Sequence, residues 1–228
     1  MAEVEIGIGK TARRAYRLDD VAIVPTKRTR DPEDVDISCD IDAYHLDLPI
    51  LGAPADSVTS PATAVEMGRL GAVGVLHLEG LWTRYDDPEP LFDEIAGLSA
   101  GKATRRLQEI YAEPVRPGLI PERVAQIKDA GVTSAVAVTP NRTLELADAV
   151  LRAEPDLLVI QGTIVSAEHV SASAAQPPLN LKTFIADLDV PVVVGGCTNY
   201  QTALHLMRTG AAGVIVGVAA DEWSTTSD

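Results

Sequence analysis

Several small or polar residues that could contact a ligand stand at the ends of short apolar runs. Asp56 and Ser57 follow one such run, Gly195 and Gly196 end a second, and Gly217 ends a third. The carboxyl ends of parallel strands are where α/β barrels place their sites, so these five residues are candidate binding residues. Asp56 could contact a ligand or cap the next turn of the chain, and the sequence leaves both interpretations open.

Two cysteines and four histidines are further residues whose side chains could do chemistry. Cys197 follows two glycines and could act as a thiol nucleophile or pack as a small buried residue, whereas Cys39 is predicted to be inert. His77 ends a predicted strand and is the best placed histidine for a site. The others are His45, His169 and His205. None of the four has ligand spacing of the H-E-x-x-H kind, so no metal site is predicted.

The elements that must position these residues are predicted from two recurring patterns. In residues 69–77, 128–138 and 208–216, a helix end is followed by glycine and an apolar run. The glycines Gly71, Gly131 and Gly210 fit left-handed helix C-caps. In residues 47–52, 154–160 and 189–194, an acidic residue and a proline introduce an apolar run. Together the patterns predict six strands, near residues 50, 74, 136, 158, 193 and 215.

Helical patterns separate these strands. Ser60 and Pro61 fit an N-cap and a first helical position, which predicts a helix to about residue 70. Further helices are predicted over residues 121–131, 141–153, 179–188 and 199–209. Alternating strands and helices indicate an α/β fold with a parallel sheet, either a (βα)8 barrel or a doubly wound sheet. No strand is followed by G-x-G-x-x-G, which favours the TIM-barrel type, with about six of its eight βα units present.

Composition excludes several classes of protein. The 228 residues have a net charge of -14, which argues against binding to nucleic acid. No apolar run approaches the roughly 18 residues needed to cross a membrane. Two cysteines cannot form a disulfide framework, so we expect a reducing compartment and a cytoplasmic location.

Five segments in one order resemble the IMP dehydrogenase/GMP reductase family. They are residues 16–25, 48–58, 71–79, 194–197 and 210–217. The resemblance is closest to the paralogue branch that lacks the inserted CBS domains. It implies a (βα)8 barrel, a homo-oligomer (usually a tetramer), a purine nucleotide substrate (IMP, XMP or GMP), and NAD or NADP as cofactor. It also implies that a cysteine attacks C2 of the purine and that backbone N–H groups hold the 5′-phosphate.

The sequence departs from the family pattern at the positions that matter for this chemistry. The family's nucleophilic cysteine falls on Ser224, and a serine hydroxyl is a far poorer nucleophile without an activating base. The other departures are Ala55 for methionine, Gln161 for aspartate, Cys197 for asparagine, and Asp221 and Glu222 for small residues. The chain is therefore predicted to be an impaired oxidoreductase of purine nucleotide metabolism. The alternative is a non-catalytic barrel that senses a purine nucleotide or mediates subunit interaction.

The predicted domain organisation is one incomplete barrel over residues 1–228. Residues 1–45 form an N-terminal preamble, and residues 80–120 form a long connection where relatives have CBS domains. A (βα)8 barrel typically needs about 250 residues, so we expect the sequence to be a fragment, a truncated gene product or an incomplete reading of a longer one. The predicted site consists of Ser224 at the catalytic position and of binding residues Asp56, Ser57, Gln161, Gly195, Gly196 and Gly217.

Overall fold

The computed structural model describes residues 3–13, 20–24, 27–163, 165–167 and 179–217. The chain divides into two compact units, residues 1–36 with 219–228 and residues 37–218. In the first unit, strands β1 (Glu3–Gly7) and β2 (Lys10–Arg13) form an antiparallel hairpin, and η2 is a short 3-10 helix over Pro32–Asp34. The single-domain prediction is not tested by this division and stays a prediction.

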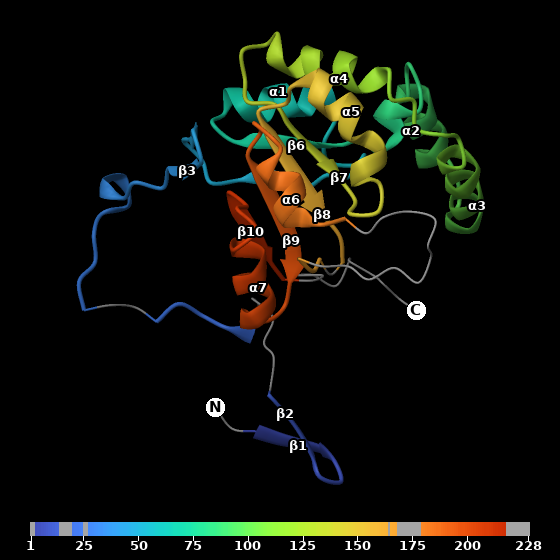
Figure 1. The fold of residues 1–228 in the computed structure, drawn as a ribbon. Helices are drawn as coiled ribbons and strands as arrows, with labels where there is room; N and C mark the ends of the chain where they lie inside the picture. The colour runs from blue at the N-terminus through green and yellow to red at the C-terminus, as the bar shows by residue number, and fades with distance from the viewer. Residues whose placement is uncertain (1–2, 14–19, 25–26, 164, 168–178, 218–228) are drawn as a thin grey trace. The chain divides into compact units, whose positions relative to one another are not determined.

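The second unit is built on a curled parallel sheet of six strands (Figure 1). The strands are β5 (Leu51–Gly52), β6 (Val73–His77), β7 (Ala135–Val138), β8 (Leu157–Gln161), β9 (Val192–Cys197) and β10 (Gly213–Val216). Their order in the sheet is the order of the sequence, β5 to β10. A doubly wound sheet reverses its strand order at a switch point, whereas a barrel does not. The α/β fold of TIM-barrel type and its six predicted strands are confirmed.

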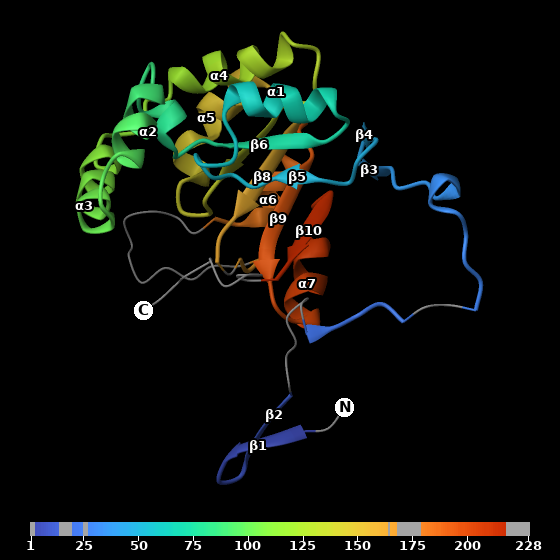
Figure 2. The ribbon, with the colours of Figure 1, turned by 180° about the vertical axis from the view of Figure 1, so that it is seen from behind.

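Helices cover one face of this sheet (Figure 1 and Figure 2). They are α1 (Pro61–Arg69), α4 (Leu119–Lys128), α5 (Thr143–Ala153), α6 (Leu181–Ala186) and α7 (Tyr200–Met207). Side chains such as Leu76, Val136 and Ile160 of the strands pack with Ile127 and Leu206 of the helices in one buried cluster. As predicted, Ser60 caps α1, and its side chain accepts a hydrogen bond from the Thr63 N–H at 3.0 Å.

The concave face of the sheet has its own smaller core. Alternate strand residues, among them Val75, Ala137 and Val159, form a second buried cluster with Leu46. Leu46 belongs to a hairpin of β3 (Cys39–Ile41) and β4 (Tyr44–Leu46), which the sequence patterns did not predict. These strands are only three residues long, too short to show an alternating pattern.

The connection over residues 80–120 contains elements of its own. These are the 3-10 helix η3 (Leu81–Thr83) and the helices α2 (Glu89–Ala96) and α3 (Ala100–Tyr111). Arg123 of α4 holds the first turn of this connection in place. The residue is only 6% exposed, and its guanidinium donates to the carbonyls of Trp82, Tyr85 and Asp86 at 2.6–3.1 Å. Within the described residues, no helix is long and apolar enough to cross a membrane.

Close contact between β6 and α1 generates a stability prediction. A Cβ atom on Gly74 would lie 2.5 Å from Cα of Ala64, so Gly74→Ala must displace helix or strand backbone. We expect the free energy of unfolding to fall by about 1–3 kcal/mol in urea titrations. The control is Gly101→Ala in α3, where a Cβ meets nothing within 4 Å. This control should be neutral or stabilising by up to about 1 kcal/mol, and equal losses in both variants would contradict the prediction.

Candidate functional site

His77 is the titratable side chain at the carboxyl end of β6. It pairs in register with Ala137 and continues the alternation of Val73 and Val75, which line the concave face. Burial lowers the pKa of His77 below its ordinary value of 6.5, and the nearby carboxylates of Glu79 and Asp56 only partly oppose this effect. The imidazole is therefore neutral at pH 7 and offers one donor and one acceptor.

Glu79 lies two residues after His77 and connects the carboxyl end of β6 with that of β7. Its Oε1 accepts a hydrogen bond from the Thr139 N–H, directly after β7, at 2.6 Å. Its backbone carbonyl accepts from Nε of Arg84 at 3.0 Å. The charge-assisted bond between Thr139 and the Glu79 carboxylate thus holds the loops after β6 and β7 together, and the bond from Arg84 lies within the loop after β6.

Asp56 joins the loop after β5 to the connection that follows β6. Its Oδ2 accepts from the Leu81 N–H at 2.9 Å and from the Tyr111 hydroxyl at 2.5 Å. The carboxylate therefore caps the first residue of η3, not the turn next to it in sequence. Burial, together with the hydrogen bond to Asp56, raises the pKa of Tyr111, which keeps the phenol protonated as a donor. Ser57, beside it, is exposed.

Gln161 and the three candidate glycines lie together at the carboxyl ends of β8, β9 and β10. Gln161 ends β8, pairs in register with Gly195, and is exposed. Gly195 and Gly196 lie in the carboxyl-terminal half of β9, at the strand end that the sequence predicts. The Gly196 N–H donates to the Gly162 carbonyl at 3.0 Å, and the Gly217 N–H donates to the Cys197 carbonyl at 2.8 Å.

Close backbone approach explains two of these glycines. A Cβ on Gly196 would lie 2.2 Å from the Gly217 carbonyl oxygen, and a Cβ on Gly195 would lie 2.5 Å from Cβ of Ile215. The glycines thus let the ends of β9 and β10 meet. A ligand-binding role for Gln161, Gly195, Gly196 and Gly217 stays a prediction.

The thiols occupy structural positions. Cys197 is 1% exposed, belongs to the larger buried cluster, and donates from Sγ to the Ile215 carbonyl at 3.5 Å. The geometry thus favours the small buried residue over the nucleophile. Cys39 is half-buried in β3. Ser224, at the predicted catalytic position, lies outside the described residues, as does His169.

The described residues do not form a cluster of acidic, thiol and imidazole side chains of the kind that binds a metal ion. In the ranges that the structure describes, no group of three or more His, Cys, Asp or Glu residues is placed to hold a metal ion.

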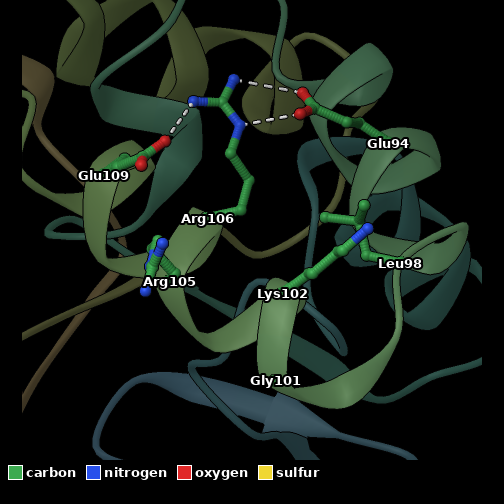
Figure 3. A pocket seen from close by; sticks show the side chains of 7 residues that line it. All are labelled: Glu94, Leu98, Gly101, Lys102, Arg105, Arg106 and Glu109. Carbon is green, nitrogen blue, oxygen red and sulfur yellow. Dashed lines mark hydrogen bonds and ion pairs between the residues drawn. The ribbon is translucent and has the colours of Figure 1, made fainter.

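A separate pocket of about 360 Å³ lies between α2 and α3 (Figure 3). Arg106 crosses it and donates to both carboxylate oxygens of Glu94 at 2.7 and 3.1 Å and to Glu109 at 3.1 Å. This guanidinium lowers the pKa of Glu94. The pocket is also lined by Leu98, Gly101, Lys102 and Arg105. None of its lining residues belongs to the carboxyl edge of the sheet.

Comparisons with known proteins agree with this geometry. The family model described as "IMP dehydrogenase / GMP reductase domain" matches residues 15–227. An uncharacterized oxidoreductase of Mycolicibacterium smegmatis is 50% identical over 99% of this chain and 61% of its own length. One of Mycobacterium tuberculosis is 49% identical with the same coverage. Inosine-5′-monophosphate dehydrogenase of Methanocaldococcus jannaschii is 41% identical over 29% of this chain and 13% of its own length.

A solved structure shows the same fold. The IMP dehydrogenase/GMP reductase-like protein of Corynebacterium glutamicum has a TM-score of 0.86 and 48% identity, covering 95% of this chain and 57% of that one. The singly wound sheet with polar residues at its carboxyl edge defines a protein of the TIM-barrel class. The chain belongs to the IMP dehydrogenase/GMP reductase family, among oxidoreductase relatives. It spans 61% of the length of the two mycobacterial relatives named above.

Three residues of the carboxyl edge were not identified from the sequence. Glu79 lies in a segment that resembles the family, but its contact with Thr139 depends on strand pairing. Arg84 and Tyr111 lie in the long connection, where no local pattern marks them. Arg84 donates to the Glu79 carbonyl within the same turn of chain, whereas the contact of Tyr111 with Asp56 forms only when α3 folds back.

The lowered pKa of His77 predicts how stability depends on pH. The unfolded chain binds more protons at this residue, so the free energy of unfolding falls as pH drops through about 6.5 and levels off below the folded pKa. His77→Gln removes this part of the pH dependence. Urea titrations at about pH 7.5 and about pH 5.5 measure the effect.

The control for this experiment is His205→Gln, on the exposed surface of α7, which should keep the wild-type pH dependence. A His77→Gln protein that loses as much stability between the two pH values as the wild type would contradict the assignment.

Proposed function

We propose that the protein is an oxidoreductase that binds a purine 5′-mononucleotide (IMP, XMP or GMP) at the carboxyl edge of β5 to β10. The observation that supports this most directly is the placement of polar side chains at that edge of a family barrel. Asp56, His77 and Gln161 come from three different strands or the loops after them, yet all stand at strand carboxyl ends. Barrel enzymes place their sites at this end of the sheet.

The donor set of these residues fits a nucleotide and a nicotinamide cofactor. Neutral His77 can donate to and accept from the edge of a base, and the exposed Gln161 amide can do the same with ribose hydroxyls. NAD or NADP, when bound, gives or takes a hydride at C2 of the purine. The chain's own residues bind and orient both ligands, and Gly217 allows close approach of the backbone.

Ser224 occupies the position of the family's catalytic cysteine, which favours a second function. A hydroxyl is a weak nucleophile without a base, and Asp221 and Glu222 bring negative charge to the place that resembles the phosphate-binding stretch. The second candidate is therefore a barrel that binds a purine nucleotide without redox chemistry, as a sensor or a subunit-interaction protein. Either function is proposed for a homo-oligomer, with the family's tetramer as the expected state.

Turnover by the full-length protein separates the two functions. We expect nicotinamide absorbance to change with IMP and NAD, or with GMP and NADPH, and Ser224→Ala to lower kcat by at least about 100-fold. The control Ser57→Ala changes an exposed hydroxyl at the same edge and should alter KM more than kcat. Calorimetric binding of a nucleotide without turnover in either direction would support the sensor, and absence of binding would contradict both.

A further inference from the structure

The carboxylate of Asp56 is shared between two segments that are distant in sequence. Its Oδ2 accepts from the Leu81 N–H at the start of η3 and from the Tyr111 hydroxyl at the end of α3. Leu81 and Tyr111 lie 25 and 55 residues from Asp56 in sequence. The loop after β5 is therefore held at its carboxylate by the connection that leads from β6 to β7.

The environment of Oδ1, the other carboxylate oxygen of Asp56, makes the position of the loop depend on the two donors to Oδ2. Oδ1 of Asp56 is buried and has no hydrogen-bond partner within the described part of the chain. A Cβ on Gly80 would lie 2.2 Å from it, so the loop packs directly on the backbone of residue 80. Because the described residues donate to Oδ2 alone, the half-buried carboxylate of Asp56 depends strongly on both the Leu81 N–H and the Tyr111 hydroxyl.

Tyr111 is itself held in place by Arg84. The guanidinium carbon of Arg84 lies 5.7 Å from the centre of the Tyr111 ring, in a cation–π contact. Arg84 also donates to the carbonyls of Glu79 and Glu113, on both sides of the connection. The hydroxyl that reaches Asp56 thus belongs to a fixed side chain, although the residue is 38% exposed.

We propose that Tyr111 is a positioning residue: its hydroxyl holds the loop of Ala55, Asp56 and Ser57 in the conformation that contacts the nucleotide. Through this bond, the connection between β6 and β7 contributes to the site without touching the ligand. The effect on ligand binding rests on the proposed function, whereas the effect on the loop does not.

Tyr111→Phe tests the proposal, with Tyr85→Phe as a matched control. The Tyr85 hydroxyl donates to the Ile110 carbonyl at 3.0 Å, so both variants remove one phenol hydroxyl that joins the same connection, and only one of them touches Asp56. In the full-length protein, we expect Tyr111→Phe to weaken calorimetric binding of IMP or GMP about tenfold. Tyr85→Phe should change it less than about twofold, with melting temperatures of the variants within about 2 °C of each other.

Hydrogen exchange measures the loop itself without any ligand. The amides of Val58 and Thr59 donate to the Ala55 carbonyl at 2.8 Å, and both should exchange faster in Tyr111→Phe than in Tyr85→Phe or the wild type. Unchanged exchange, or equal acceleration in both variants, overturns the positioning role. If the wild type binds neither nucleotide, the proposed function fails, and the exchange comparison alone decides the role of Tyr111.

Discussion

A parallel sheet must bury both of its faces, and the rest of the structure follows from this requirement. The convex face is covered by the helices that alternate with the strands. The concave face is filled by small and branched side chains, with Leu46 of the β3–β4 hairpin packed against them. Asp156 fixes the strands at the amino end: its Oδ2 accepts from the N–H and hydroxyl of Ser134 at 2.8 Å, and its Oδ1 accepts from the Tyr44 hydroxyl at 3.3 Å.

The two ends of the sheet differ in what their loops do. At the amino end, the carboxylate of Asp156 ties strands and hairpin together beside a buried core. At the carboxyl end, Asp56 and Glu79 tie loops to one another, and His77 and Gln161 remain partly or fully accessible. The proposed ligand contacts therefore lie at the opposite end of the sheet from the Asp156 contacts, which is the arrangement typical of barrel enzymes. The neutral state of His77 is a product of the same burial that stabilises the sheet.

The sequence was sufficient for the six strands of the main sheet and the helices that cover it. It was insufficient for the β3–β4 hairpin and for the contacts between the ends of elements. Strand and helix boundaries follow local chemistry: Gly71, Gly131 and Gly210 have the positive φ of helix C-caps, and Ser60 begins α1. The Asp56–Tyr111 bond depends on how α3 packs, which no local pattern encodes. Gly195 and Gly196 are predicted at a strand end, but nothing in the sequence shows that their lack of side chains lets β9 approach β10 there.

Arg123 attaches the connection between β6 and β7 largely through the main chain of residues 82–86. The guanidinium donates to the main-chain carbonyls of Trp82, Tyr85 and Asp86, and its carbon lies 5.7 Å from the centre of the Trp82 ring in a cation–π contact. It therefore selects a backbone path and favours an aromatic side chain at residue 82, whereas its hydrogen bonds to Tyr85 and Asp86 do not depend on the side chains of those residues. Hydrogen bonds of this kind tolerate substitution of the residues whose carbonyls accept them, so much of this connection can change in sequence while the neighbouring strands keep their positions.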